Sequence, residues 1–314
     1  MSAPPDGRSA INDLGLERYS ARPLTMDDSR GVFELMAAEE LEGLGEVAIE
    51  EADIIGDWQR PSFDLTSQTI GVLAGDRLVG YAEVATGGRA DASVAVDHRG
   101  RGIGTALARW TRRVAGRDGS DSVGMPVLEG SPGEALLRGL GYRVRWTSWV
   151  LALPGGSGIE PQPVPDGYGI RQADGEQDHH RVHEVVEDAF LEWADRDRES
   201  FEDFAAVVTR RPGFEPWNIR LMTDPGGEVV GACIVQLSEG CGYVSRLAVR
   251  RDQRGLGLAR ALLVDSFAAA REHCATRSEV ATDSRTGALG LYEKVGMVVT
   301  STWLNLAIDT SGRR

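Results

Sequence analysis

The sequence predicts an α/β chain that folds as two tandem domains. Segments with the period-two alternation of strands and segments with helical period follow one another along both halves of the chain. One pattern, an apolar strand followed by a Gly-rich turn and a long amphipathic helix, occurs twice, with residue 254 matching residue 99 at an offset of 155. A repeat of that length indicates a duplicated domain, and 314 residues suffice for two ordinary hydrophobic cores.

Periodicity and local start and stop signals predict the elements of the first half. Ser131 and Pro132 are typical of a helix start, Gly141 of a helix end, and Gly75-Asp76 of a hairpin turn. The predicted elements are a strand over 19–22, a helix from 28 or 29, a helix over 47–58, hairpin strands over 69–74 and 77–84, a motif strand ending at 96, a helix to about 114, a strand over 122–128, a helix over 131–140 and a closing hairpin over 142–153.

The same order is predicted again in the second half. The predicted elements are a strand over 168–171, helices over 179–190 and 200–208, hairpin strands over 220–223 and 229–237, a motif strand over 243–249, a helix over 257–273, a strand over 279–282, a helix over 286–294 and the last strands over 297–308. The predicted domain organisation is an N-terminal arm over 1–18, a first domain over 19–153, a Gly/Pro-rich linker over 154–167 and a second domain over 168–310.

The repeated turn has the composition of an anion site. Each copy reads Arg-x-x-Gly-x-Gly/Ala, over 99–104 and over 254–259. Glycine lets the backbone approach a bound group with no side chain in the way, and the N–H groups at the start of the following helix attract negative charge. The pattern therefore predicts a phosphate-binding turn in each half.

These turns resemble the signature of the GNAT superfamily of N-acyltransferases, Arg/Gln-x-x-Gly-x-Gly/Ala. The matching residues are Arg99, Gly102 and Gly104 in the first copy and Arg254, Gly257 and Ala259 in the second. The resemblance implies that each domain is a mixed, mostly antiparallel twisted sheet flanked by helices, with acyl-CoA wedged where two parallel strands splay. The two-domain plan is similar to that of mycothiol synthase, but the likeness lies in architecture, so no substrate is carried over.

The resemblance also implies where acyl-CoA binds. Pantetheine would lie along the motif strand of the second domain, and the pyrophosphate would lie on the turn. The implied residues are Leu247, Ala248, Val249, Arg254, Gly255, Leu256, Gly257, Leu258, Ala259 and Arg260, with Arg99, Gly100, Arg101, Gly102, Ile103 and Gly104 as a second site in the first domain. Arg250, Arg251 and Arg260 surround the second turn and could meet the ribose phosphate of CoA.

The two halves differ at the family's second signature. Residues 288–297 are similar to the family's short helix ending in Leu-Tyr-Glu-Lys-x-Gly-Phe, and the resemblance implies that Tyr292 is the general acid for the departing thiolate. The alternative is that Tyr292 is a half-buried aromatic residue that packs a helix on the sheet. At the same offset the first half has Leu137, which cannot donate a proton. We therefore expect the chemistry in the second domain and a binding, structural or substrate-shaping role for the first.

The resemblance implies an acetyl-CoA-dependent N-acetyltransferase in which a neutral primary amine attacks the thioester directly. A non-catalytic acyl-CoA-binding sensor or partner module is the alternative. A small-molecule amine is the expected acceptor, and a protein amine is the second option. The general base stays open, because the motif strand offers no carboxylate; nearby candidates, each also typical of a solvated surface, are Glu187, Asp188, Glu192 and Glu239.

Composition narrows the class of protein. Apolar content of 41% and charged content of 26% are typical of a globular chain, and the net charge of −14 argues against nucleic acid or an anionic membrane surface as a partner. No apolar stretch is long enough to span a membrane. Three cysteines without Cys-x-x-Cys spacing predict reduced thiols in a cytoplasmic protein. His179 and His183 share a helix face, but the sequence shows no third ligand beside them, so no metal is expected. We expect the protein to be a monomer or a homodimer.

Overall fold

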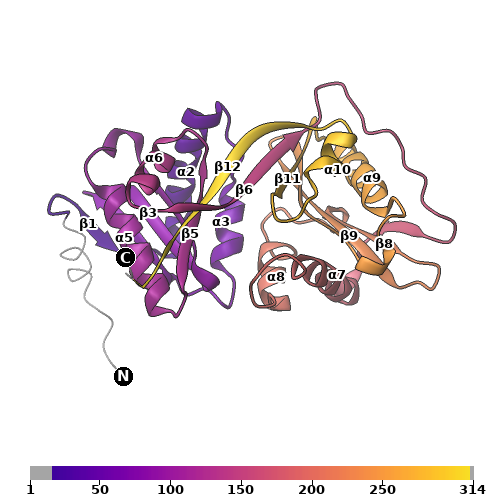
Figure 1. The fold of residues 1–314 in the computed structure, drawn as a ribbon, viewed down its shortest axis with the longest axis horizontal. Helices are drawn as coiled ribbons and strands as arrows, with labels where there is room; N and C mark the ends of the chain where they lie inside the picture. The colour runs from indigo at the N-terminus through magenta and orange to yellow at the C-terminus, as the bar shows by residue number, and fades with distance from the viewer. Residues whose placement is uncertain (1–15, 312–314) are drawn as a thin grey trace. The chain divides into compact units, whose positions relative to one another are not determined.

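The computed structural model describes residues 16–311, which form two compact units (Figure 1). Unit 1 comprises the described residues up to Thr147 together with those from Trp303 onward, and unit 2 comprises Ser148–Thr302. Most of the predicted N-terminal arm, residues 1–15, lies outside the described part of the chain. No helix within residues 16–311 is long and apolar enough to cross a membrane.

The sheet of unit 1 has the strand order β1-β2-β3-β4-β5-β12, and its parallel pair is β4 with β5, joined at Arg89 and Gly124. Gly80 and Tyr81 of β3 face opposite sides of this sheet. A Cβ on Gly80 would contact Ile103 of α5, while the Tyr81 hydroxyl donates to Met36 of α2, so these helices cover opposite faces. The elements are β1 (Ser20–Arg22), η1 (Met26–Asp28), α2 (Ser29–Leu44), α3 (Glu51–Trp58), α4 (Leu65–Gln68), β2 (Thr69–Ala74), β3 (Arg77–Ala85), η2 (Thr86–Gly88), β4 (Arg89–Val94), η3 (Val96–His98), α5 (Ile103–Arg117), β5 (Ser122–Leu128), α6 (Pro132–Gly139) and the first half of β6 (Arg143–Ala152).

The sheet of unit 2 has the strand order β6-β11-β10-β9-β8-β7, and its parallel pair is β10 with β11. One buried cluster packs α9 on the sheet and a second packs α7 and α8, which together give the sheet two covered faces. The elements are β7 (Gly169–Gln172), α7 (Gly175–Phe190), α8 (Phe201–Val207), η4 (Pro216–Asn218), β8 (Ile219–Thr223), β9 (Val229–Ser238), β10 (Cys241–Val249), η5 (Arg251–Gln253), α9 (Leu258–Glu272), β11 (Arg277–Asp283), α10 (Leu289–Lys294) and the first part of β12 (Val298–Asp309).

Each sheet is completed by a strand from the other half of the chain. Residues Ser148 to Ala152 of β6 pair antiparallel with β11 in unit 2, and Trp303 to Asp309 of β12 pair antiparallel with β5 in unit 1. The predicted closing hairpin over 142–153 is therefore wrong, because this segment is one strand whose second half pairs outside the first repeat. The domain ranges 19–153 and 168–310 follow the sequence repeat and stay predictions, while the compact units divide the chain after Thr147 and Thr302.

Candidate functional site

Both repeated turns adopt the backbone conformation that only glycine takes without strain. In unit 2, Gly257 is the N-cap of α9 with φ +79°, and Gly255 has φ +82°. In unit 1, Gly102 is the N-cap of α5 with φ +87°, and Gly100 has φ +72°. The first N–H groups of each helix have no partner inside the helix. Each turn therefore presents backbone donors to an anion.

In unit 2 the parallel strands open directly ahead of the turn. β10 and β11 pair only from Cys241 to Val244 on one strand and from Arg277 to Val280 on the other. The register between β10 and β9 shifts between Val244 and Arg246, which places a bulge at Ser245. Beyond the bulge, β10 pairs with β9 along one edge only. The backbone of Leu247, Ala248 and Val249, the predicted pantetheine strand, therefore has an unpaired edge that an extended ligand can bind.

The signature arginine of each turn is held by a carboxylate. In unit 2, Arg254 donates from Nε to the Val249 carbonyl at 3.1 Å and from both Nη atoms to Glu192 at 2.9 and 2.7 Å. In unit 1, Arg99 forms an ion pair with Glu42. Because the Arg254 guanidinium is already engaged, its side chain fixes the turn to the end of β10, and contact with a phosphate would come through its backbone.

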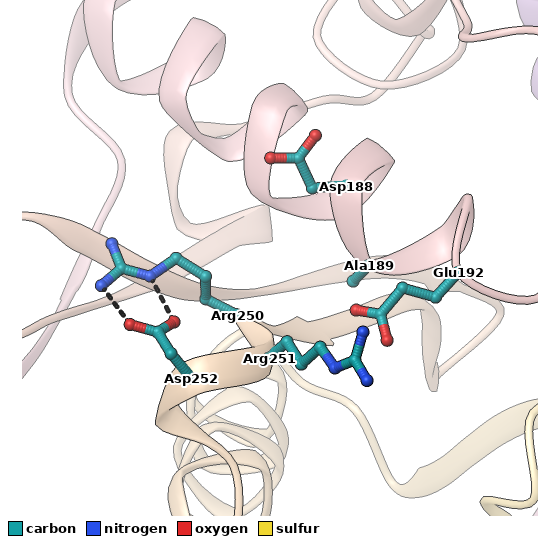
Figure 2. Close-up of a pocket in the computed structure, with 6 residues that line it drawn as sticks. All are labelled: Asp188, Ala189, Glu192, Arg250, Arg251 and Asp252. Carbon is teal, nitrogen blue, oxygen red and sulfur yellow. Dashed lines mark hydrogen bonds and ion pairs between the residues drawn. The ribbon is translucent and has the colours of Figure 1, made fainter.

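A hollow of about 490 Å³ lies beside the unit 2 turn, between the end of α7 and η5 (Figure 2). Asp252 binds the Arg250 guanidinium with two hydrogen bonds of 2.7 and 2.9 Å, and Arg260 donates to the Glu160 carbonyl at 3.2 Å. Arg251 has no ion pair with any described residue. Of the three arginines predicted around the turn, Arg251 alone keeps its charge free for a ligand. The lining residues are Asp188, Ala189, Glu192, Arg250, Arg251 and Asp252.

Tyr292 lies on α10 and is only 5% exposed. It belongs to the same buried cluster as Val244 and Val249 of the motif strand and Leu258 at the start of α9. Burial raises the pKa of Tyr292 well above its usual range, with the neighbouring Cys233 adding to the shift. Its hydroxyl makes no hydrogen bond within residues 16–311. Packing of the ring in the core is thus established, and the hydroxyl keeps its proton throughout the neutral range.

Residues 179–297 match the sequence model of the acetyltransferase (GNAT) family. The chain is 28% identical over 262 residues to a mycothiol acetyltransferase of Salinispora arenicola (strain CNS-205), a match that covers 79% of this chain and 82% of the relative. A GCN5-related N-acetyltransferase from Sphaerobacter thermophilus superposes with a TM-score of 0.73 at 26% identity, over 94% of this chain and 96% of that one. Residues 179–297 therefore carry the sequence pattern of GNAT acetyltransferases, and the chain as a whole is similar to members of that family.

The fold of the whole chain is also similar to that of a solved protein with tandem repeats. A tandem GNAT protein from the clavulanic acid biosynthesis pathway superposes with a TM-score of 0.71 at 18% identity, over 94% of this chain and all of that one (100%). At that identity the likeness shows the fold alone, and it confirms the predicted α/β class. The GNAT family uses acyl-CoA as cosubstrate, and the two features of unit 2 described above fit its parts: a glycine turn with open space at Gly255 for the pyrophosphate and an unpaired strand edge for pantetheine.

Three of the four carboxylates considered as general bases in unit 2 are paired with arginines. Glu187 is 0% exposed, accepts two hydrogen bonds from Arg196 at 2.7 and 2.8 Å, and accepts another from the Glu199 N–H at 2.8 Å. Burial opposes its ionisation, but these hydrogen bonds outweigh burial and hold the pKa of Glu187 below its usual range. Asp188 pairs with Arg198. Glu192 pairs with the signature arginine, as described above, and Glu239 lies in the turn before β10, at the end away from the opening.

One carboxylate that the sequence did not reveal reaches the motif strand. Glu199, in the segment before α8, accepts a hydrogen bond from Arg246 at 2.8 Å, one residue beyond the bulge. The Arg246 guanidinium also lies 5.1 Å from the centre of the Phe204 ring. Glu199 and Arg246 are 47 residues apart in the chain, and no spacing rule links them. A carboxylate is therefore present beside the opening although β10 itself carries none.

Unit 1 has the same kind of turn, but the residues around it differ. Leu137, at the position matching Tyr292, is buried in a cluster that includes Val123, Met125 and Tyr142. The Cδ2 of the neighbouring Leu136 lies 2.7 Å from where a Cβ on Gly104 would stand, so α6 packs closely on α5 and a side chain at position 104 would displace that of Leu136. Unit 1 thus has a phosphate-type turn but a leucine, which has no proton to donate, at the position that matches Tyr292.

Unit 1 also carries two carboxylates with raised pKa values. Glu83 on β3 lies directly opposite Asp91 on β4, and Trp58 donates a hydrogen bond of 2.7 Å to Glu83. Burial, reinforced by Asp57, raises the pKa of Glu83 to about 7, and burial raises the pKa of Asp91 to about 6 in spite of Arg89. Groups with raised pKa values favour the folded state at acidic pH, and this contribution is lost as the pH rises through 6 to 7.

Proposed function

We propose that unit 2 transfers an acetyl group from acetyl-CoA to a primary amine, with Tyr292 as general acid. The observation that carries the proposal is that the parallel strands open at Ser245 immediately before a glycine turn, with a buried tyrosine in the cluster that lines the same strand. Unit 1 has a turn of the same conformation but a leucine in place of that tyrosine.

The expected reaction needs no nucleophile from the enzyme. The amine nitrogen attacks the thioester carbonyl carbon, a C–N bond forms, and the C–S bond breaks. The unpaired N–H groups of β10 stabilise the negative charge on the carbonyl oxygen. The departing thiolate takes the Tyr292 proton, the amine releases one proton to water, and the phenolate recovers a proton from water. The products are an amide and the CoA thiol.

We propose a small-molecule primary amine as the acceptor, with a protein amine as the second candidate. The match to a relative named as a mycothiol acetyltransferase favours the small molecule, and the net charge of −14 favours a cationic amine.

The full chain should be incubated with acetyl-CoA and a panel of primary amines while free CoA thiol and acetylated product are measured. We expect thiol release that depends on an amine, with one acetyl group added per thiol released. Binding of acetyl-CoA with no amine-dependent release would instead favour the non-catalytic sensor, and product found only with peptide amines would favour the protein acceptor.

Arg251 is expected to bind the ribose 3′-phosphate of CoA, because its guanidinium alone among the three arginines near the turn has no partner. Loss of one charge-assisted hydrogen bond corresponds to roughly tenfold weaker binding. Arg251→Ala should therefore weaken CoA binding about tenfold and leave 3′-dephospho-CoA binding unchanged, as measured by calorimetry. Arg250→Ala is the matched control, since Arg250 is already held by Asp252. An equal loss for both ligands would contradict this assignment.

A further inference from the structure

The Gly/Pro-rich linker over 154–167 is anchored to unit 2 beside the glycine turn. Most of its residues are exposed, but Ile159 is buried at 9% exposure in the cluster that contains Leu258, the first residue of α9. Removal of an aliphatic side chain from water stabilises the contact. The chain between the repeats is therefore held against the start of α9 at this point.

Two further contacts tie the linker to the ends of the turn. Arg260, on the first turn of α9, donates to the Glu160 carbonyl at 3.2 Å. Tyr168, just after the linker, donates its hydroxyl proton to the side-chain oxygen of Gln253, the last residue of η5. The turn over 254–259 lies between Gln253 and Arg260 in the chain. The linker segment is thus hydrogen-bonded to the residues that directly precede and follow the proposed pyrophosphate-binding turn.

Gln162 lies in the chain between Glu160 and Tyr168, the two residues that make these contacts. Its amide nitrogen lies 3.0 Å from where a Cβ on Gly257 would stand, and its Cδ lies at 3.1 Å from the same point. The side chain is half-buried and makes no hydrogen bond to any residue in the described part of the chain. The nearby Arg260 Nε is buried and also lacks a hydrogen-bond partner. Two side-chain donors without partners therefore lie at a turn built to attract an anion.

Resting on the proposed function, we propose that Gln162 is an acyl-CoA-binding residue whose amide N–H donates to a pyrophosphate oxygen at the unit 2 turn. A neutral amide adds a donor beside the backbone N–H groups without repelling the phosphate. The corresponding place in unit 1 is apolar, because the nearest atom to a Cβ on Gly102 is Leu16 Cδ2 at 3.9 Å. The linker thereby distinguishes the two turns, which have the same backbone conformation.

The test compares Gln162→Leu and Gln162→Glu with the wild type in the full chain. Leucine has nearly the size of glutamine but cannot donate, and glutamate repels phosphate. Val164→Ala, an exposed change on the same linker, is the control for disturbance of the linker. Acetyl-CoA affinity is measured by calorimetry, and kcat/KM is measured with acetyl-CoA and with S-acetylpantetheine, which has the thioester but no pyrophosphate.

We expect Gln162→Leu to weaken acetyl-CoA binding about tenfold, Gln162→Glu to weaken it further, and neither to change kcat/KM for S-acetylpantetheine. Unchanged acetyl-CoA affinity in Gln162→Leu would overturn the assignment. Tighter binding would overturn it too and would show that Gln162 obstructs the site. A wild-type chain that does not bind acetyl-CoA would overturn the proposed function itself, which separates the two failures.

Discussion

Tyr292→Phe is expected to lower kcat by about 10²- to 10⁴-fold with little change in the affinity for acetyl-CoA. Phenylalanine keeps the ring that packs in the buried cluster with Val244 and Val249, and removes only the hydroxyl. Without a proton donor, the thiolate must leave unprotonated or take its proton from water. Steady-state kinetics with the acceptor at saturation, together with calorimetric titration of acetyl-CoA, measure the two quantities separately.

Tyr142→Phe provides the matched control, because Tyr142 is a buried tyrosine of unit 1. We expect its kcat to equal that of the wild type. Since burial raises the pKa of Tyr292 above the ordinary tyrosine value of about 10, this acid stays protonated across neutral pH and causes no loss of activity below about pH 10. An unchanged kcat in Tyr292→Phe would leave this residue with a packing role alone.

Glu187→Gln is expected to destabilise unit 2 by about 3 kcal/mol at neutral pH. The Glu187 carboxylate has no exposed surface and accepts three hydrogen bonds, two from Arg196 and one from the Glu199 N–H. An amide keeps the volume but loses the charge and one acceptor oxygen. Urea unfolding of both proteins at pH 7.5 gives the difference in the free energy of unfolding.

The loss of stability caused by Glu187→Gln should become smaller as the pH falls. The folded-state pKa of Glu187 is lowered from 4.5, so its contribution to stability is present above that pH and is lost as the pH falls through the folded-state value. The difference between wild type and Glu187→Gln should therefore shrink on acidification below pH 4.5. Asp188→Asn, at a neighbouring carboxylate with 65% exposed side chain, should cost less than about 1 kcal/mol. Equal losses in the two variants would contradict a buried role for Glu187.

The sequence predicted those parts of the site that depend on the conformation or side-chain chemistry of residues close together in the chain. Gly255 and Gly257 are needed because the chain takes a positive φ at both positions, and the same cause repeats at Gly100 and Gly102. The α/β class, the two turns and the helices that follow them could therefore be predicted from spacing. The exchange of Tyr292 for Leu137 between the repeats was likewise visible as a difference in side-chain chemistry at matching positions.

The parts that the sequence did not predict depend on contacts between distant segments. The second half of β6 pairs with β11, and the second half of β12 pairs with β5, although each strand follows its own repeat in the chain. Alternating strands fit either sheet equally well, so their pattern does not select a partner. Composition likewise predicted only a spacer over 154–167, because a single isoleucine and a single glutamine carry no periodic signal that they anchor on α9 and Gly257.

Calorimetric titration of acetyl-CoA into the wild type, Gly102→Glu and Gly257→Glu tests most directly whether unit 2 is the working site. The two glycines have similar positive φ values, +87° and +79°, so glutamate introduces similar backbone strain in the two variants, although a side chain at position 257 also displaces Gln162. We expect Gly257→Glu to abolish binding and amine-dependent turnover, and Gly102→Glu to retain both. Retention of binding and turnover by Gly257→Glu, with their loss in Gly102→Glu, would contradict the assignment of the chemistry to unit 2.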